Sequence, residues 1–405
     1  MQVITILIAL YFGLAPVFWW PGILPDTLLI VKCSLIVSFV SFVWVKALLS
    51  NKIRFPSGLL GPVGWLFFLV VSCGGFYYSV NMITALDVIK DFSLCFIMLW
   101  SFYMACSFDL SYERLFFVAA LIVAAHCALV DCSYFFGFPS WSGPSHFVAS
   151  KLSISGFGAL RTGWSNGVSL FVPFLCGVFF LKRTKVFVKV VAILSIVIII
   201  TSQVVVAGRA GIIASLISLV YLIYHKKNKF GFIVSFLIVL FLVFECSDYI
   251  ITLLRVEPVI TGGVGAEFLD DVSAGRLSSS LFAIKMASKQ ILFGYGFGNF
   301  RIHGMEVHNL WIRLFVEGGL FLPVLFLCIV ILIMKKGRKL VSKLSFNSEN
   351  IAGKDFFSFY HVLNAVLIAG FFISLLEPRT LLGSFQVSAI WWASAGVVVA
   401  QYDKR

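Results

Sequence analysis

Three arginines stand in short motifs whose residue types suit the binding of an anion. Arg161 opens the run Arg-Thr-Gly-Trp-Ser-Asn, Arg209 lies within Gly-Arg-Ala-Gly, and Arg276 follows a glycine. A guanidinium holds two phosphate oxygens by paired hydrogen bonds, so these residues predict contacts to a diphosphate. The competing interpretation is structural, because each arginine could instead pair with a carboxylate or a lipid headgroup, and Arg209 could extend to the membrane interface.

His308 is the candidate for proton transfer. It lies in Val-His-Asn-Leu-Trp, at the start of an apolar run. A neutral imidazole accepts a proton from a hydroxyl, so His308 is predicted to act as a general base. A histidine at a helix entrance also serves as a capping or interfacial residue. Nearby carboxylates, which an outer loop would also simply expose to solvent, offer a second candidate base: Glu267, Asp270, Asp271 and Glu306.

A glycine-rich run precedes His308. Glycines alternate from Gly294 to Gly298, and a second glycine motif, Glu317-Gly318-Gly319, follows His308. Alternate glycines permit a tight turn or a close approach of two backbones. The spacing differs from the dinucleotide-binding fingerprint and no strand precedes it, so the run predicts a turn without a nucleotide site.

The elements that must position these residues are membrane helices. The 405-residue chain is 60% hydrophobic and 12% charged, with a mean hydropathy of +1.03, whereas soluble domains are about 25% charged. The formal charge of +13 comes largely from short clusters between apolar runs, which excludes a nucleic-acid-binding protein. The nine cysteines form no CxxC pair and no zinc-ligand spacing, so we expect neither a metal nor a cofactor.

The apolar runs predict an all-α polytopic fold, with residues 1–405 as a single integral membrane domain. The first run has no cleavage site and is expected to be a retained helix. Basic clusters in alternate connections place both termini in the cytoplasm. The twelve predicted spans are residues 3–20, 27–45, 58–79, 90–108, 115–136, 166–181, 186–206, 209–225, 230–247, 309–334, 358–376 and 382–400.

Two outer loops follow from this topology, at residues 137–165 and 248–308. In the larger loop, Leu277, Leu281, Ile284 and Ile291 recur at helical spacing beside Lys285 and Lys289, which predicts an amphipathic helix on the outer membrane surface. Arg161 precedes a helix whose N-terminus points outward, and a helix N-terminus favours anions. The cations on the outer side are Lys151, Arg161, Arg209, Arg255, Arg276, Lys285, Lys289, Arg301, Arg313 and Arg379.

The order of these motifs resembles the O-antigen ligase and O-antigen polymerase superfamily of bacterial membrane proteins. The resemblance consists of the Gly-Arg-Ala-Gly corner, the Gly-Arg of the outer loop, the Gly-x-Gly-x-Gly-Asn-Phe run, and His-Asn opening a helix that ends in Val-Glu-Gly-Gly. These motifs lie between Arg161 and Gly319, and the topology extends the likeness over most of the chain. Ala210 and Ser280-Leu281 depart from the residues that several relatives carry at these points.

The resemblance implies a fold similar to the lipid-dependent, GT-C-like glycosyltransferases, in the bacterial inner membrane with the active site facing the periplasm. It implies metal-independent, inverting transfer of an undecaprenyl-diphosphate-linked oligosaccharide or polysaccharide to a sugar hydroxyl. Arg161, Arg209 and Arg276 take the positions that contact the diphosphate. Arg276 and His308 are the implied catalytic residues, with His308 as the base.

Three functions remain open. An O-antigen polymerase, extending the chain on its lipid carrier with a chain-length regulator as a further expected partner, is favoured over an O-antigen ligase that joins the polymer to lipid A-core. Both use the same donor and differ in the acceptor. A transporter or flippase of a lipid-linked sugar is the third, although transporters usually keep polar residues at mid-membrane on broken helices.

Overall fold

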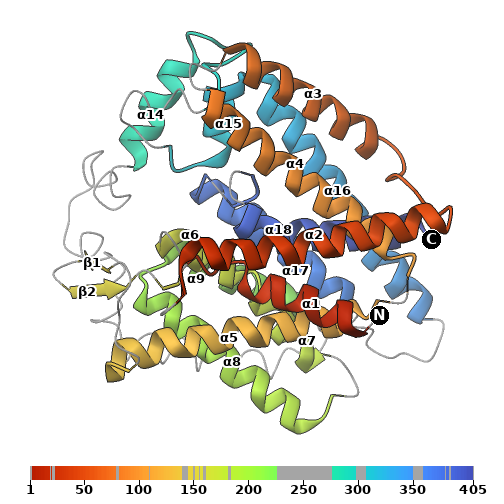
Figure 1. Cartoon of the computed structure of the whole chain (residues 1–405), viewed down its shortest axis with the longest axis vertical. Helices are drawn as coiled ribbons and strands as arrows, with labels where there is room; N and C mark the ends of the chain where they lie inside the picture. The colour runs from red at the N-terminus through yellow and green to blue at the C-terminus, as the bar shows by residue number, and fades with distance from the viewer. Residues whose placement is uncertain are drawn as a thin grey trace. The chain divides into compact units, whose positions relative to one another are not determined.

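The computed structural model (Figure 1) is mostly helical and divides into two compact units. The first unit comprises Met1–Phe42, Phe108–Glu257 and Lys339–Ala369, and the second comprises Val43–Ser107, Pro258–Arg338 and Gly370–Arg405. The structure describes residues 2–18, 20, 23–78, 82–108, 110–138, 145–148, 151–154, 156–157, 161–180, 184–225, 276–297, 307–349, 359–378, 380–382 and 385–404.

In the first unit, helix α5 packs along α1 and α8, while α6 and α7 pack on α9. Two short strands, β1 (Ser145–Val148) and β2 (Lys151–Ile154), form an antiparallel hairpin in which Ser145 lies opposite Ile154. The helices are α1 (Gln2–Leu14), the first part of α2 (Pro25–Leu49), α5 (Tyr112–Phe136), α6 (Arg161–Ser169), α7 (Val172–Phe180), α8 (Val186–Val205), α9 (Arg209–Tyr224) and the start of α17 (Phe359–Leu376).

In the second unit, α4 packs along α18, α3 packs on α4, and α14 packs on α15. The adjacent rings of Trp391 and Trp392 are fully buried in this unit, which shows how completely α18 is covered. The helices are α3 (Leu60–Tyr78), α4 (Met82–Ala105), α14 (Arg276–Ala287), α15 (Leu310–Gly318), most of α16 (Phe321–Glu349), the end of α17 and α18 (Phe385–Asp403).

Six helices in the described part of the chain are long and apolar enough to cross a membrane. Their side chains supply an apolar surface, and a helix satisfies its own backbone in lipid, so the protein is membrane-embedded. The remaining predicted spans stay predictions, and residues 230–247 lie outside the described residues, as does much of both outer loops. The six are Pro25–Leu49, Ala85–Ala105, Tyr112–Phe136, Thr162–Phe179, Val186–Val205 and Phe359–Leu376.

Two predicted spans are interrupted in the structure. Residues 166–181 fall across α6 and α7, because the apolar stretch Thr162–Phe179 contains a turn at Leu170 and Phe171. Residues 309–334 form α15 and α16, because Gly319 adopts a φ of 69° that ends the first helix and that glycine accommodates without steric cost. Beyond the predicted span, α16 continues through the lysine-rich residues 335–343 to Glu349.

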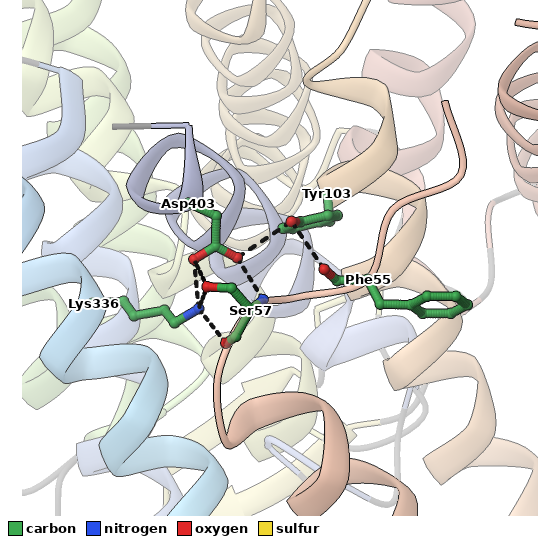
Figure 2. Close-up of polar contacts among 5 residues, drawn as sticks. All are labelled: Phe55, Ser57, Tyr103, Lys336 and Asp403. Carbon is green, nitrogen blue, oxygen red and sulfur yellow. Dashed lines mark hydrogen bonds and ion pairs between the residues drawn. The ribbon is translucent and has the colours of Figure 1, made fainter. Parts of the chain in front are cut away.

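A polar cluster, which we call the C-terminal clasp, fastens the end of α18 within the second unit (Figure 2). Asp403 accepts hydrogen bonds from the Ser57 backbone N–H at 2.8 Å and from the Lys336 Nζ at 2.7 Å. The Tyr103 hydroxyl lies 3.2 Å from the same carboxylate and 3.1 Å from the Phe55 carbonyl. The clasp therefore joins α4, α16, α18 and the segment before α3 through a single carboxylate.

Candidate functional site

Arg276 is the first residue of α14, and its guanidinium is held at the end of α17. One terminal nitrogen donates to Glu377 Oε1 at 2.8 Å, and the other donates to the Leu376 carbonyl at 3.2 Å. The Glu377 side chain is 9% exposed and that of Arg276 is 28% exposed. Arg276 is therefore fixed on one side and accessible on another.

His308 precedes a well-anchored helix start. Its neighbour Asn309 is the N-cap of α15, and the Asn309 Oδ1 accepts from the backbone N–H groups of Trp311 and Ile312 at 2.9 and 3.1 Å. The Asn309 amide nitrogen donates to the Leu375 carbonyl at 2.7 Å. One asparagine thus caps α15 and ties it to α17, which fixes the backbone next to His308.

The last turn of α17 brings these two segments together. Arg276 contacts Leu376 and Glu377, Asn309 contacts Leu375, and the Trp311 indole donates to Ser374 Oγ at 3.1 Å. The final carbonyls of a helix have no intrahelical donor, so they accept these outside groups readily. The predicted catalytic arginine and the residue beside the predicted base therefore share one anchoring point.

The two glycine motifs pack on each other. Gly294 has a φ of +67°, and a Cβ added there would lie 2.5 Å from the Gly319 nitrogen and 2.6 Å from the Val316 carbonyl oxygen. The Tyr295 N–H donates to that carbonyl at 2.7 Å. The close backbone approach that the glycine spacing permits is confirmed here, with the Val-Glu-Gly-Gly segment as its partner.

Helix α14 occupies the segment for which an amphipathic helix is predicted. It buries Ala283 and Ala287 beside Val316 of α15, whereas Leu281 and Ile284 are exposed. Ile291, which the pattern assigns to the helix, follows it in a turn because α14 ends at Ala287. The small alanines allow close packing on α15, and the larger apolar side chains face outward.

Some outer arginines follow the structural interpretation. Arg313 Nε lies 3.1 Å from Glu317 one turn later in α15; the Glu317 side chain is buried, and the Arg313 side chain is 13% exposed. This pair accounts for Arg313 and for the glutamate of the Glu-Gly-Gly motif without a ligand. Arg276 is also paired with a carboxylate, but it keeps more exposure than Arg313. Arg255, Arg301 and Arg379 lie outside the described residues.

In the first unit, the Arg209 corner packs against the Arg161 motif. The Ser165 hydroxyl donates to the Gly208 carbonyl at 3.1 Å, and a Cβ on Gly211 would lie 2.6 Å from the Ser165 carbonyl oxygen. The Gln203 amide donates to that same oxygen at 3.2 Å. Glycine is therefore required where α9 crosses α6, so the two motifs form one structural feature.

Both arginines of this corner begin helices. Arg161 is the first residue of α6 and Arg209 is the first residue of α9, so each stands where free backbone N–H groups favour an anion. The side chain of Arg161 lies outside the described residues. The structure thus groups the four predicted residues in pairs: Arg161 and Arg209 in the first unit, Arg276 and His308 in the second.

Three charged residues that the sequence motifs do not single out have partners in the structure. Glu377 binds Arg276, Asp131 accepts from Ser202 Oγ at 2.6 Å, and the buried Lys32 donates to the Val17 carbonyl at 2.7 Å. Asp131 and Lys32 stand inside apolar runs, where a charge is costly and marks a paired or functional group. The sequence alone shows that Asp131 and Lys32 interrupt apolar runs. It does not show that Glu377 pairs with Arg276.

No family model matches the chain, and no curated protein matches it significantly.

Proposed function

We propose that the protein is a membrane-embedded glycosyltransferase that uses an undecaprenyl-diphosphate-linked glycan and acts as an O-antigen polymerase at the periplasmic face of the inner membrane. The observation that carries the proposal is the convergence of Arg276 and Asn309 on the last turn of α17. It supports a site in which one rigid element holds the Arg276 guanidinium and anchors Asn309, the residue that follows His308.

The proposed reaction follows from charge. The acceptor hydroxyl oxygen attacks the anomeric carbon, the bond from that carbon to the diphosphate oxygen breaks, and His308 takes the hydroxyl proton. Negative charge grows on the leaving diphosphate, so fixed cations stabilise the transition state more than the ground state. Arg276 donates two of its hydrogen bonds to α17 and Glu377, which leaves three of the five N–H groups of a guanidinium for phosphate oxygens.

Arg161 and Arg209 are also proposed to bind diphosphate. The close packing of α6 on α9 at Ser165 and Gly208 supports this role, because it keeps two arginine-bearing helix starts in a fixed relation. Direct displacement with inversion requires no metal if the arginines carry the charge. A ligase shares this donor chemistry and differs in using lipid A-core as its acceptor.

A transporter of lipid-linked sugars is the second candidate. It is favoured by the polar contacts inside the apolar helices of the first unit, where Ser202 bonds Asp131 and Lys32 bonds the Val17 carbonyl. Transporters use intramembrane polar groups of this kind. The glycosyltransferase is preferred because the arginine motifs gather at helix starts instead.

The test is a lipopolysaccharide gel of the source bacterium with the gene deleted and complemented by wild type, Arg276→Gln or His308→Ala. A polymerase predicts loss of the ladder in the deletion strain and both variants, with a single repeat unit still on the core. Loss of every capped band, with polymer accumulating on its lipid carrier, would identify a ligase.

The matched control is Lys285→Gln, which removes one positive charge from the exposed side of the same helix, α14. It should restore the ladder, and all variants should reach wild-type abundance in membranes. An unchanged gel in the deletion strain would reject both enzymes. Lipid-linked repeat units trapped on the cytoplasmic leaflet would indicate the transporter.

A further inference from the structure

Glu377 is the buried partner of the predicted catalytic arginine. We infer that Glu377 is a positioning residue that holds the Arg276 guanidinium in the orientation that receives the diphosphate. This inference rests on the proposed function. Glu377 lies just past the end of α17, 101 positions along the chain from Arg276, with which it makes a 2.8 Å ion pair.

The geometry of the contacts around Arg276 favours a positioning role for Glu377 over a simple ion pair. Arg276 has a second acceptor besides Glu377, since its other terminal nitrogen donates to the Leu376 carbonyl. Two acceptors on consecutive residues fix the plane of the guanidinium as well as its distance. A free arginine side chain loses rotamer entropy when it is ordered, and here that ordering precedes substrate binding.

The same helix end anchors Asn309, the residue that follows the predicted base. The Leu375 carbonyl accepts from Asn309, so consecutive residues of α17 hold the segment of His308 and the guanidinium of Arg276. The C-terminal end of a helix carries partial negative charge, which adds to the attraction of Glu377 for a cation. A change at Glu377 should therefore displace Arg276 while leaving the Asn309 contact in place.

The alternative is an ion pair that only stabilises the fold. A structural pair and a positioning pair both suffer when Glu377 becomes alanine, so abundance alone does not separate them. They differ in their response to charge exchange. Combining Arg276→Glu with Glu377→Arg keeps opposite charges in contact, but moves the cation from α14 to the end of α17.

The experiment uses the full-length protein in lipid nanodiscs, with lipid-linked glycan extracted from the deletion strain as donor. Glu377→Ala should lower kcat about 10- to 100-fold, since a charge-assisted hydrogen bond is lost from the reacting cation. Glu377→Gln keeps an acceptor oxygen and should retain activity within a few-fold of wild type. The exchanged pair should restore thermal stability relative to either single variant and should remain inactive.

A second measurement does not depend on turnover. Phenylglyoxal modification of Arg276, followed by peptide mass spectrometry, should be several-fold faster in Glu377→Ala than in wild type, because the guanidinium loses a buried partner. Arg114 serves as the internal reference, since it lies in the first unit.

These readouts separate the two ideas. If wild type transfers no glycan, the proposed function fails whatever Glu377 does. If wild type is active and Glu377→Ala keeps full kcat and KM, the positioning role is wrong and the proposed function stands. If the exchanged pair is active, the positioning role and the catalytic role of Arg276 are both wrong, while glycan transfer itself stands.

Discussion

Gly294 and Gly319 face each other so closely that a Cβ on Gly294 would lie 2.5 Å from the backbone nitrogen of Gly319. Each glycine belongs to a motif that sequence reasoning treats separately, and the second unit joins them by backbone hydrogen bonds. The Leu320 N–H, next to Gly319, donates to the Ile291 carbonyl at 2.7 Å. The contact fixes the turn after α14 to the break between α15 and α16.

Gly294→Ala should destabilise the protein by about 2–5 kcal/mol, because it adds a steric clash to an unfavourable positive φ. Thermal unfolding of the purified protein in detergent would measure this loss. Gly64→Ala is the matched control. Gly64 lies within helix α3 of the same unit, and its Cβ would make an ordinary contact of 3.7 Å with the Phe96 side chain. If Gly294→Ala unfolded at the same temperature as this control, the close approach would be wrong.

Gly208→Ala should impair folding because the new methyl group overlaps the Ser165 side chain. A second change, Ser165→Gly, removes the overlapping atoms and should recover part of the lost abundance, although it sacrifices one hydrogen bond and adds a glycine inside a helix. Fluorescence-detected size exclusion of tagged protein provides the measurement. Equal losses in the single and double variants would contradict the contact.

Asn309→Ala should destabilise α15 by about 1–2 kcal/mol through loss of its N-cap. Asn309→Asp keeps the capping oxygen but cannot donate to the Leu375 carbonyl, so it isolates the tie to α17. We expect Asn309→Asp to lower glycan transfer more than its effect on unfolding temperature explains. Parallel losses of activity and stability would show that the tie has no separate part in placing His308.

The C-terminal clasp predicts a pH dependence. Burial alone would raise the pKa of Asp403, but hydrogen bonds from Lys336 and Ser57 outweigh it and hold the pKa below the ordinary 3.8. A carboxyl with a lowered folded pKa contributes stability above the unfolded pKa and loses it as the pH falls through the folded value. The stability advantage of wild type over Asp403→Asn, about 2 kcal/mol, should therefore be constant near neutrality.

Urea unfolding of detergent-solubilised protein across a pH series would test this. The advantage should shrink only as the pH drops below about 3.8. Lys336→Met should remove most of the same advantage at neutral pH, because Asp403 then loses its ion-pair partner. An advantage that disappears between pH 7 and 5 would assign the effect to another group.

Helix α14 should contact lipid through its exposed apolar side chains. Leu281 and Ile284 are 60% and 44% exposed, and at 12 residues α14 is too short to span a membrane, so a position at the interface fits it best. A photo-crosslinking amino acid at either position should label phospholipid acyl chains in nanodiscs. The same probe at Ala287, which is buried beside Val316 of α15, should label them much less, and equal labelling would reject an oriented surface helix.

Local features of the sequence predicted the helices well but not their interruptions. An apolar run long enough to cross a membrane must become helical, because lipid offers no partner for its backbone. The breaks at Leu170 and Gly319 lie inside such runs, where hydropathy barely changes. The glycine at position 319 is visible in the sequence, yet its left-handed conformation depends on the turn at Gly294 packing against it.

The sequence by itself determined that this is a helical membrane protein, and it marked Arg161, Arg209, Arg276 and His308 as candidates, because hydropathy and residue chemistry are local properties. The tertiary structure decided that Glu377 holds Arg276 and that Ser165 faces the Arg209 corner. These pairs join residues far apart in the chain. No local pattern specifies such contacts, since they arise only when helices pack and bring distant side chains within hydrogen-bonding distance.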